Sequence, residues 1–244
     1  MKNKERKLKS WQGWLIFSSS MVVVFCLGLL AASVTERRAE IQSIYANKKD
    51  KIAPFEARNE MYRGNYPREY ETWTYTADTS FRSEFNGSQA IDVLEQRPNM
   101  VIFWAGYAFS RDYTSPRGHM HAIQDMQRTL RTGNPGIDGA GDMQPATCWV
   151  CKSPDVPRMM QAIGVDEFYK NKWSSLGSDI VNPIGCADCH DPETMDLHIS
   201  RPALIEAFQR RGLDITKASH QEMRSLVCAQ CHVEYYFKGE GKYL

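Results

Sequence analysis

The sequence lacks a charge excess of either sign and has no long internal repeat. Its 30 Lys and Arg residues nearly balance 29 Asp and Glu, for a net charge of +1, which gives no reason to expect a nucleic-acid partner. Nothing recurs with a period of about 20 to 50 residues except a short cysteine motif, so a solenoid or propeller is not indicated. The contents of 42% apolar and 24% charged residues are those of a globular rather than a disordered chain.

Long aliphatic runs are also scarce in the segment 36–160, which is rich in Arg, Asp, Tyr, Trp and Gly. Such a segment forms only a thin core from its own side chains, unless large apolar groups complete it. An aromatic content of 11% fits packing against flat rings, although aromatic residues are also ordinary core residues.

The N-terminal segment differs, because a basic start precedes a long apolar run. MKNKERKLKS (1–10) is followed by an apolar stretch from Trp14 to Ala32, which polar TERRAE ends. This order is typical of an export signal, and the length also suits a membrane anchor of about 20 apolar residues. Both alternatives place the rest of the chain outside the cytoplasm. We therefore predict a signal peptide or membrane anchor over 1–34 and one exported domain over 35–244.

Six of the seven cysteines form three C-x-x-C pairs, and Cys26 lies in the apolar segment. The motifs are CWVCK (148–152), CADCH (186–190) and CAQCH (228–232). Cysteines three positions apart share one side of a helical turn, so their thiols reach the two vinyl groups of one haem while the next imidazole binds the iron. Zinc and disulfides are the alternatives, but neither explains a histidine that twice follows the second cysteine directly. The pattern therefore favours covalent haem, whose porphyrin faces would complete the thin core.

Lys152 takes the place of histidine in the first motif, which has three interpretations. The motif binds no haem, or the lysine lies beside a haem ligated from elsewhere, or its amine binds the iron. A free lysine, with a pKa of about 10.4, is protonated, but iron and burial both favour the neutral amine. A haem with one amine ligand keeps an open coordination position for a substrate, whereas two histidine ligands suit electron transfer. The third interpretation therefore predicts one reaction site and two relay haems.

These motifs resemble the ammonia-forming cytochrome c nitrite reductases, a family of periplasmic pentahaem enzymes. The resemblance covers about residues 55 to 240, and it implies a mainly α-helical multihaem cytochrome c with short irregular segments and little sheet, wrapped around a haem cluster. It also implies six-electron reduction of nitrite to ammonia, with electrons from a quinol-linked membrane or cytochrome donor, and a homodimer. The similar stretches are CWVCKSPDVPR (148–158), GCADCH (185–190), CAQCHVEYYF (228–237), WAGYAFSRDYTSPRGHMHA (104–122) and LRTG (130–133).

The resemblance assigns roles to individual residues. Lys152 is implied to be the axial ligand of the catalytic haem, Arg131 to bind the anion, and Tyr235 to supply a proton or hydrogen bond. Glu234 and the carbonyl of Tyr235 are implied to bind calcium. Taken alone, Arg131 and His119 would be interpreted as a solvated arginine at a helix end and a surface residue at a helix start. The implied haem-binding residues are Cys148, Cys151 and Lys152, then Cys186, Cys189 and His190, then Cys228, Cys231 and His232 with His119 as its distal partner.

Local patterns predict further elements. We expect an amphipathic helix over 119–131, another over 200–212, and a turn with a helix start at SPDVPR (153–158). The apolar and aromatic run NMVIFWAGY (99–107) predicts a strand. The Gly- and Pro-rich stretch 133–141 predicts a loop that lets Arg131 fold back over the first haem. Histidines without motif support are expected to be neighbours or surface residues: His121, His198 and His220.

Other features of the family are not found in this sequence. They are two further C-x-x-C-H motifs, a distal active-site histidine, the remaining calcium ligands and the helices of the dimer. We therefore expect the chain alone to reduce nitrite poorly. Extension by a second half that carries these features should raise the rate. Two other functions stay open: a multihaem electron carrier without its own catalysis, and a related reductase of hydroxylamine or another nitrogen oxide.

Overall fold

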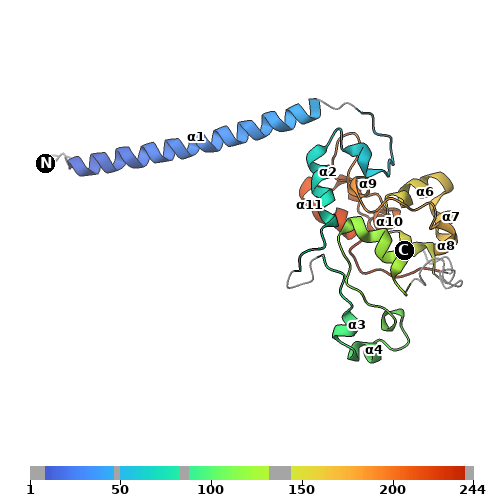
Figure 1. Ribbon diagram of the computed structural model, residues 1–244. Coiled ribbons are helices and arrows are strands. Elements are labelled where there is room, and N and C mark those ends of the chain that lie inside the picture. Colours follow the sequence, from blue (N-terminus) through green and yellow to red (C-terminus); the bar gives the residue numbers. More distant parts are fainter. Residues whose placement is uncertain (1–8, 47–49, 83–87, 132–143, 240–244) are drawn as a thin grey trace. The chain divides into compact units, whose positions relative to one another are not determined.

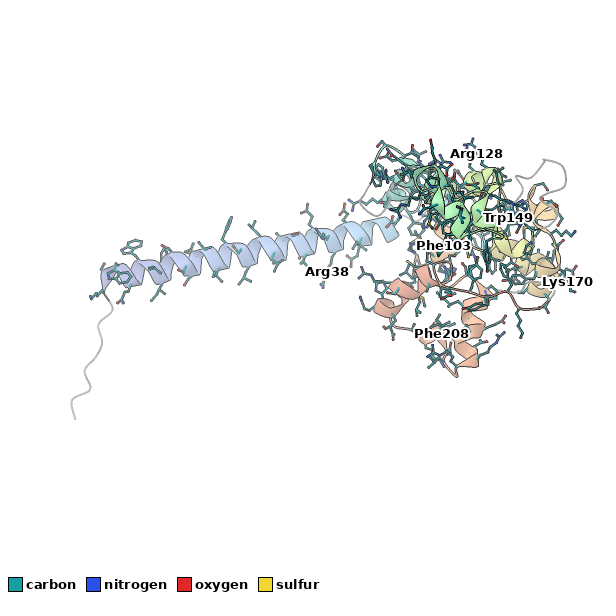
Figure 2. All side chains as sticks on the ribbon, turned by 90° about the horizontal axis from the view of Figure 1, so that it is seen from below. Arg38, Phe103, Arg128, Trp149, Lys170 and Phe208 are labelled. Carbon is teal, nitrogen blue, oxygen red and sulfur yellow. The ribbon has the colours of Figure 1, made fainter. Side chains whose placement is uncertain are left out.

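The chain divides into two units, Met1–Lys49 and Asp50–Leu244, in a computed structural model that describes residues 9–46, 50–82, 88–131 and 144–239. The first unit is α1 (Ser10–Ala46), a single helix of 37 residues that continues past the expected boundary at residue 34. The helix is drawn in blue in Figure 1, and its side chains project on every side in Figure 2. Apolar side chains such as Phe25 are exposed. Residues Ser10–Gln42 are long and apolar enough to cross a bilayer, a test that an N-terminal signal sequence passes as well.

The second unit consists of short helices and irregular segments, and its described residues contain no strand. The prediction of a mainly α-helical fold with little sheet is confirmed (Figure 1). Its α-helices are α2 (Pro67–Thr74), α3 (Val93–Gln96), α4 (Asn99–Phe103), α5 (Ala122–Arg128), α6 (Asp155–Ile163), α7 (Val165–Lys170), α8 (Trp173–Leu176), α9 (Cys186–Cys189), α10 (Pro202–Arg210) and α11 (His220–Ala229). Its 3-10 helices are η1 (Asn59–Tyr62), η2 (Tyr75–Ala77), η3 (Ala108–Ser110), η4 (His119–His121), η6 (Ala146–Trp149) and η7 (Ile215–Lys217).

The helices that follow two of the motifs begin where the sequence predicts. Pro154 precedes α6 and Pro157 lies in its first turn, where a missing N–H removes no helical hydrogen bond. Pro202 opens α10, and Gly212 follows it with φ +73°, a left-handed conformation that favours glycine after a helix end. These two predictions are confirmed.

The predicted strand over 99–107 is wrong. Residues Asn99–Phe103 form the short helix α4, which Pro98 precedes in helical conformation. Ile102 and Phe103 are 80% and 78% exposed, and no described segment offers a neighbouring strand with which this run could form a ladder. An extended segment without a partner gains no ladder hydrogen bonds, so the local helical turn is preferred. In Figure 1, α3 and α4 lie at the end of a loop, apart from α6 to α11.

The predicted helix over 119–131 forms only in part. It begins as η4, continues as α5 and ends at Arg128. Thr129 is extended because its hydroxyl donates to the Asp112 carboxylate at 2.7 Å, which also accepts the N–H of Leu130 at 2.9 Å. Arg131 therefore lies beyond the helix, in a segment held by Asp112, rather than at a solvated helix end.

Two buried clusters form the core of the second unit, and each contains one cysteine motif. The first surrounds Trp149, whose ring stacks on Trp173 with centroids 3.4 Å apart. The second contains Cys186, packed with Tyr62 and Tyr66. The third motif lies at the end of α11, where Cys228 is exposed. The first two motifs therefore lie in these clusters, whereas the third begins at an exposed cysteine.

Candidate haem-binding and catalytic site

The three cysteine motifs differ in backbone as well as in sequence. In the two that end in histidine, the N–H of His190 or His232 donates to the carbonyl of Cys186 or Cys228 at 2.8 Å, which closes an α-helical turn. In the first motif the N–H of Lys152 donates to the Trp149 carbonyl at 2.9 Å, which makes a tighter turn after η6. The Lys-ending motif is therefore a distinct local structure.

The ring of His190 is held in an orientation that suits a metal ligand. Its Nδ1 is 2.8 Å from the carbonyl of Met195, which can only accept, so Nδ1 carries the proton. Buried Met195 has φ +66°, an uncommon conformation for a residue with a side chain. Because Nδ1 donates to the backbone, Nε2 keeps its lone pair for a metal, the usual arrangement behind a ligating histidine.

His119 and His232 come from distant parts of the sequence and lie close together. Their ring centroids are 6.3 Å apart, with an angle of 30° between the ring planes. A metal ion bonded to a nitrogen of each ring at about 2 Å would place the ring centres about 6 Å apart. Loss of solvent around His119, and next the positive charge of His232, lower the pKa of His119 and favour its neutral form. Neutral imidazole is the form that binds metal, and the separation of the two rings matches that of two imidazoles on one metal ion.

The turn that carries His119 is fastened to η2. A Cβ on Gly118 would lie 2.1 Å from the carbonyl oxygen of Thr76, so the approach of the two backbones requires glycine. The N–H of Met120 is 3.2 Å from Thr76 Oγ1, and Nε2 of His121 is 3.0 Å from the Ala77 carbonyl. The chain itself thus binds the His121 ring, in keeping with the prediction that His121 is a neighbour rather than a ligand.

Arg131 is half-buried and linked to the first motif. Its guanidinium carbon is 5.3 Å from the centre of the Phe109 ring and 5.7 Å from that of Tyr113, a cation–π arrangement. Its carbonyl accepts from Gln144 Nε2 at 3.0 Å, and Gln144 Oε1 is 3.8 Å from the sulfur of Cys148. The predicted loop 133–141 lies outside the described residues.

Tyr235 lies within electrostatic reach of both the first motif and Arg131. Partial burial of its phenol, then the neighbouring thiols of Cys151 and Cys148, raise the pKa of Tyr235, and the Arg131 guanidinium opposes this. The phenol therefore keeps its proton at neutral pH and can donate a hydrogen bond. Half-buried Lys152 belongs to the same surroundings, because its charge counteracts the rise that burial produces in the pKa of Cys148.

The cysteine thiols are unpaired, as covalent haem attachment requires. All seven cysteines lie in the described part of the chain, and none forms a disulfide. Burial raises the pKa of the Cys186 and Cys189 thiols to about 12. A hydrogen bond between Cys151 and Cys231 lowers the pKa of the former and raises that of the latter, so the first and third motifs are in contact. The three thiol pairs and the oriented histidines fit c-type haem.

The calcium ligands are not assembled in the described residues. Glu234 is exposed and accepts from the hydroxyl of Tyr236 at 3.2 Å. Among described side chains, no group of three or more His, Cys, Asp and Glu could hold a metal ion. Calcium prefers about 6 to 8 oxygen ligands, more than Glu234 and one carbonyl supply. The calcium site stays a prediction.

Of the two histidines expected at the surface, His220 is exposed. His198 is half-buried, and its backbone N–H donates to the Cys189 carbonyl.

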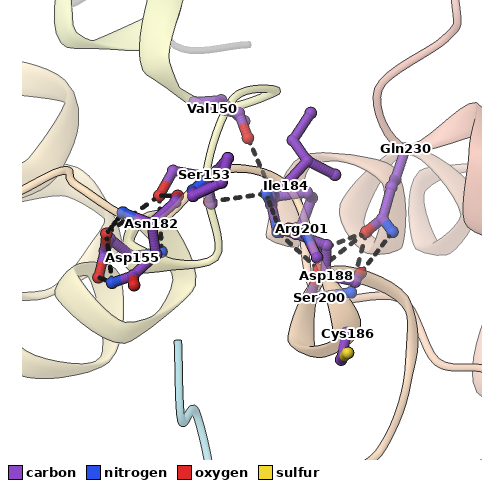
Figure 3. Close-up of polar contacts among 12 residues, drawn as sticks. Val150, Ser153, Asp155, Asn182, Ile184, Cys186, Asp188, Ser200, Arg201 and Gln230 are labelled. Atoms are coloured by element: carbon purple, nitrogen blue, oxygen red, sulfur yellow. Dashed lines mark hydrogen bonds and ion pairs between the residues drawn. The ribbon is translucent and has the colours of Figure 1, made fainter. Parts of the chain in front are cut away.

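Arg201 is the main residue of the site that sequence reasoning missed. It is fully buried, donates to the carbonyls of Val150 at 2.6 Å and Ser153 at 3.0 Å, and pairs with the carboxylate of Asp188 (Figure 3). The sequence carried one signal: an arginine directly before Pro202 lies at a helix N-terminus, where a cation is unfavourable unless it is paired.

Asn59 supports the second motif in a similar way. Its Oδ1 accepts the N–H of Cys186 at 2.8 Å, and its Nδ2 donates to the Pro183 carbonyl at 3.3 Å. A Cβ on Gly185 would lie 1.8 Å from Asn59 Oδ1, so only glycine leaves room for this side chain. No sequence pattern indicates this contact, which joins η1 to α9.

The helical fold and its cysteine pairs are those of a multihaem cytochrome. The chain belongs to the cytochrome c552 family, whose profile matches residues 58–243. Two relatives named cytochrome c-552 are 72% identical over 240 residues, from Parabacteroides distasonis, and 46% identical over 225 residues, from Aliarcobacter butzleri. The matches cover 98% and 91% of this chain but 48% and 43% of the relatives, so the chain spans about half the length of the curated relatives it matches.

A solved structure of cytochrome c nitrite reductase from Desulfovibrio desulfuricans has the same fold. The TM-score is 0.72 at 32% identity, over 78% of this chain and 42% of that one, which is described as a catalytic subunit with two calcium sites. The resemblance to cytochrome c nitrite reductases is thereby confirmed. Membership in the cytochrome c552 family indicates covalently bound haem c.

Proposed function

We propose that this chain carries three c-type haems and provides the catalytic haem of an ammonia-forming nitrite reductase. The observation that carries the proposal is the gathering of Arg131 and Tyr235 around the one motif that ends in Lys152. An electron carrier has no use for an anion-binding arginine and a proton donor beside one haem. The proposed attachment sites are Cys148 with Cys151, Cys186 with Cys189, and Cys228 with Cys231.

Each protein group has a task in the reaction, which turns nitrite, six electrons and eight protons into ammonium and two water molecules. Lys152 would hold the iron of the catalytic haem, and that iron would supply the place where nitrite is reduced. The Arg131 guanidinium attracts the anion and stabilises negative charge on its oxygens. The Tyr235 phenol donates a hydrogen bond or proton to the same oxygens.

The other two haems are proposed to relay electrons. The proximity of the His119 and His232 rings supports the proposal that these two residues would hold the third haem. The hydrogen bond from His190 to the Met195 carbonyl supports ligation of the second haem by Nε2. Iron with two histidine ligands has no open position, which suits electron transfer rather than substrate binding.

The surroundings proposed for the protein follow from α1 and from the relatives. The long apolar helix supports export to the periplasm, either with cleavage or with retention as an anchor. A quinol-linked membrane protein or a cytochrome would then supply electrons. The calcium sites of the Desulfovibrio desulfuricans enzyme support calcium at Glu234 and the Tyr235 carbonyl, and a homodimer is proposed for the complete enzyme.

Replacement of Lys152 by histidine tests this function. Lys152→His should keep the haem but lower ammonium formation about tenfold or more, because a change of ligand alters the electron density at the iron. Ammonium is measured from nitrite with a dithionite-reduced dye, on the exported chain joined to the second half of the Parabacteroides distasonis relative. Lys170→His is the matched control, since Lys170 is exposed and pairs with the exposed Glu167. An unchanged rate in Lys152→His would contradict a special role for the amine.

A further inference from the structure

Each cysteine motif contributes the residue before its second cysteine to one buried polar cluster. Ser200 and Arg201, at the start of α10, contact all three of these residues. The Arg201 cluster is defined as Val150, Asp188, Ser200, Arg201 and Gln230, which Figure 3 shows together. The exposed fraction is 0% for Val150 and Arg201, 2% for Asp188 and 3% for Gln230, so the contacts are shielded from water.

The guanidinium of Arg201 joins the first two motifs. Its Nε donates to the Val150 carbonyl at 2.6 Å, and its Nη2 pairs with the Asp188 carboxylate. Its Nη1 donates to the Ser200 hydroxyl at 2.6 Å, so every nitrogen of the fork has an acceptor. The planar fork fixes the directions of these bonds, and a shift of one motif would strain the contact with the other.

Gln230 adds the third motif. Its Oε1 accepts the N–H groups of Ser200 at 2.9 Å and Arg201 at 3.1 Å. Its Nε2 donates to the Asp188 carbonyl at 2.8 Å, and the Ser200 hydroxyl donates to the same carbonyl at 2.6 Å. The amide thus uses both ends to hold the third motif against the second and against the start of α10.

We propose that Arg201 is a positioning residue that sets the distances and orientations of the three haem-attachment motifs, and so controls electron transfer between the haems. The inference rests on the proposed function, because it needs haem at each motif. The nitrogens of the Arg201 fork donate to protein acceptors. Arg201 acts through Val150, Asp188 and Gln230, which lie between the paired cysteines. A fully paired buried network of this kind holds one arrangement, whereas a partly paired one permits several.

Three variants of the exported holoprotein test the proposal. Arg201→Lys keeps the charge beside Asp188 but loses the fork, and Ser200→Ala removes one hydroxyl from the edge of the cluster. Arg210→Lys is the control, because Arg210 is exposed on the same helix and pairs with Glu206. Covalent haem is counted by intact mass, the midpoint potentials are titrated, and electron equilibration among the haems is followed after partial photoreduction.

Arg201→Lys and Ser200→Ala should both keep three haems and shift at least one midpoint potential. Both should also slow electron equilibration, by about tenfold in Arg201→Lys, because small displacements matter where geometry sets a rate. Arg210→Lys should match the parent. Unchanged potentials and rates in both cluster variants would overturn the proposal. Should Arg201→Lys lose haem, Ser200→Ala decides: slower equilibration supports the proposal and an unchanged rate overturns it. Absence of haem from the parent would instead refute the proposed function.

Discussion

Replacement of Trp149 by alanine is expected to destabilise the folded chain by about 4 kcal/mol, the cost typical of deleting a buried tryptophan. Trp149 is fully buried between the cysteines of the first motif, and its ring stacks on Trp173 with centroids 3.4 Å apart. Its Nε1 donates to the Trp173 carbonyl at 3.0 Å. Alanine would leave a cavity next to Cys148 and Cys151 and remove the hydrogen bond to the Trp173 carbonyl, so less haem should be attached at this motif as well.

The free energy of unfolding is measured by urea denaturation followed by far-ultraviolet circular dichroism. Trp14→Ala is the matched control, because Trp14 is 69% exposed on α1 and belongs to the other unit. The control should leave the transition of the second unit unchanged. A loss below about 1 kcal/mol for Trp149→Ala would show that the core around the first motif does not depend on the stacked pair, since surface changes fall in that range.

Replacement of Arg131 by alanine is expected to weaken nitrite binding and reduction by about 100-fold, which corresponds to about 3 kcal/mol for a lost charge-stabilising donor. The guanidinium rests on Phe109 and Tyr113, and the Arg131 carbonyl is bound by Gln144. The backbone contact does not depend on the side chain, so alanine should leave the segment in place. The haem absorption spectrum should therefore stay the same.

Nitrite binding is measured by titrating the haem absorption, a readout that does not require turnover, and ammonium formation is measured in parallel. Arg128→Ala is the control, since Arg128 is the exposed last residue of α5. The affinity of the Arg128→Ala variant for nitrite should equal that of the parent. Loss of haem in Arg131→Ala would show instead that the arginine is structural, and an unchanged affinity would remove it from the anion site.

Local sequence patterns predicted the features that neighbouring residues determine. The start of α6 after Pro154 and the end of α10 before Gly212 follow from proline and glycine geometry, and the three motifs follow from the spacing of their cysteines. The strand predicted over 99–107 was wrong because its apolar and β-branched residues fit a strand only where a partner strand exists. The helix predicted over 119–131 ends early because Asp112, which is distant in sequence, binds Thr129 and Leu130.

Long-range pairs were beyond the reach of local patterns. The pairing of His119 with His232 was implied by the resemblance. The distance between their rings depends on the hydrogen bonds between η4 and η2. Arg201 belongs to no sequence motif, and its acceptors come from separate segments: the carbonyls of Val150 and Ser153, the Asp188 carboxylate and the Ser200 hydroxyl. A buried arginine is visible only once the fold brings its acceptors together.

The intact mass of the exported chain, made with a complete haem-attachment system, tests the central claim most directly. The account predicts a mass increase of three covalent haems, and of two in a variant with Cys148 and Cys151 replaced by alanine. The attachment at CWVCK is the decisive one, because the proposed catalytic site depends on it. A parent chain with only two haems and free thiols at Cys148 and Cys151 would contradict the account.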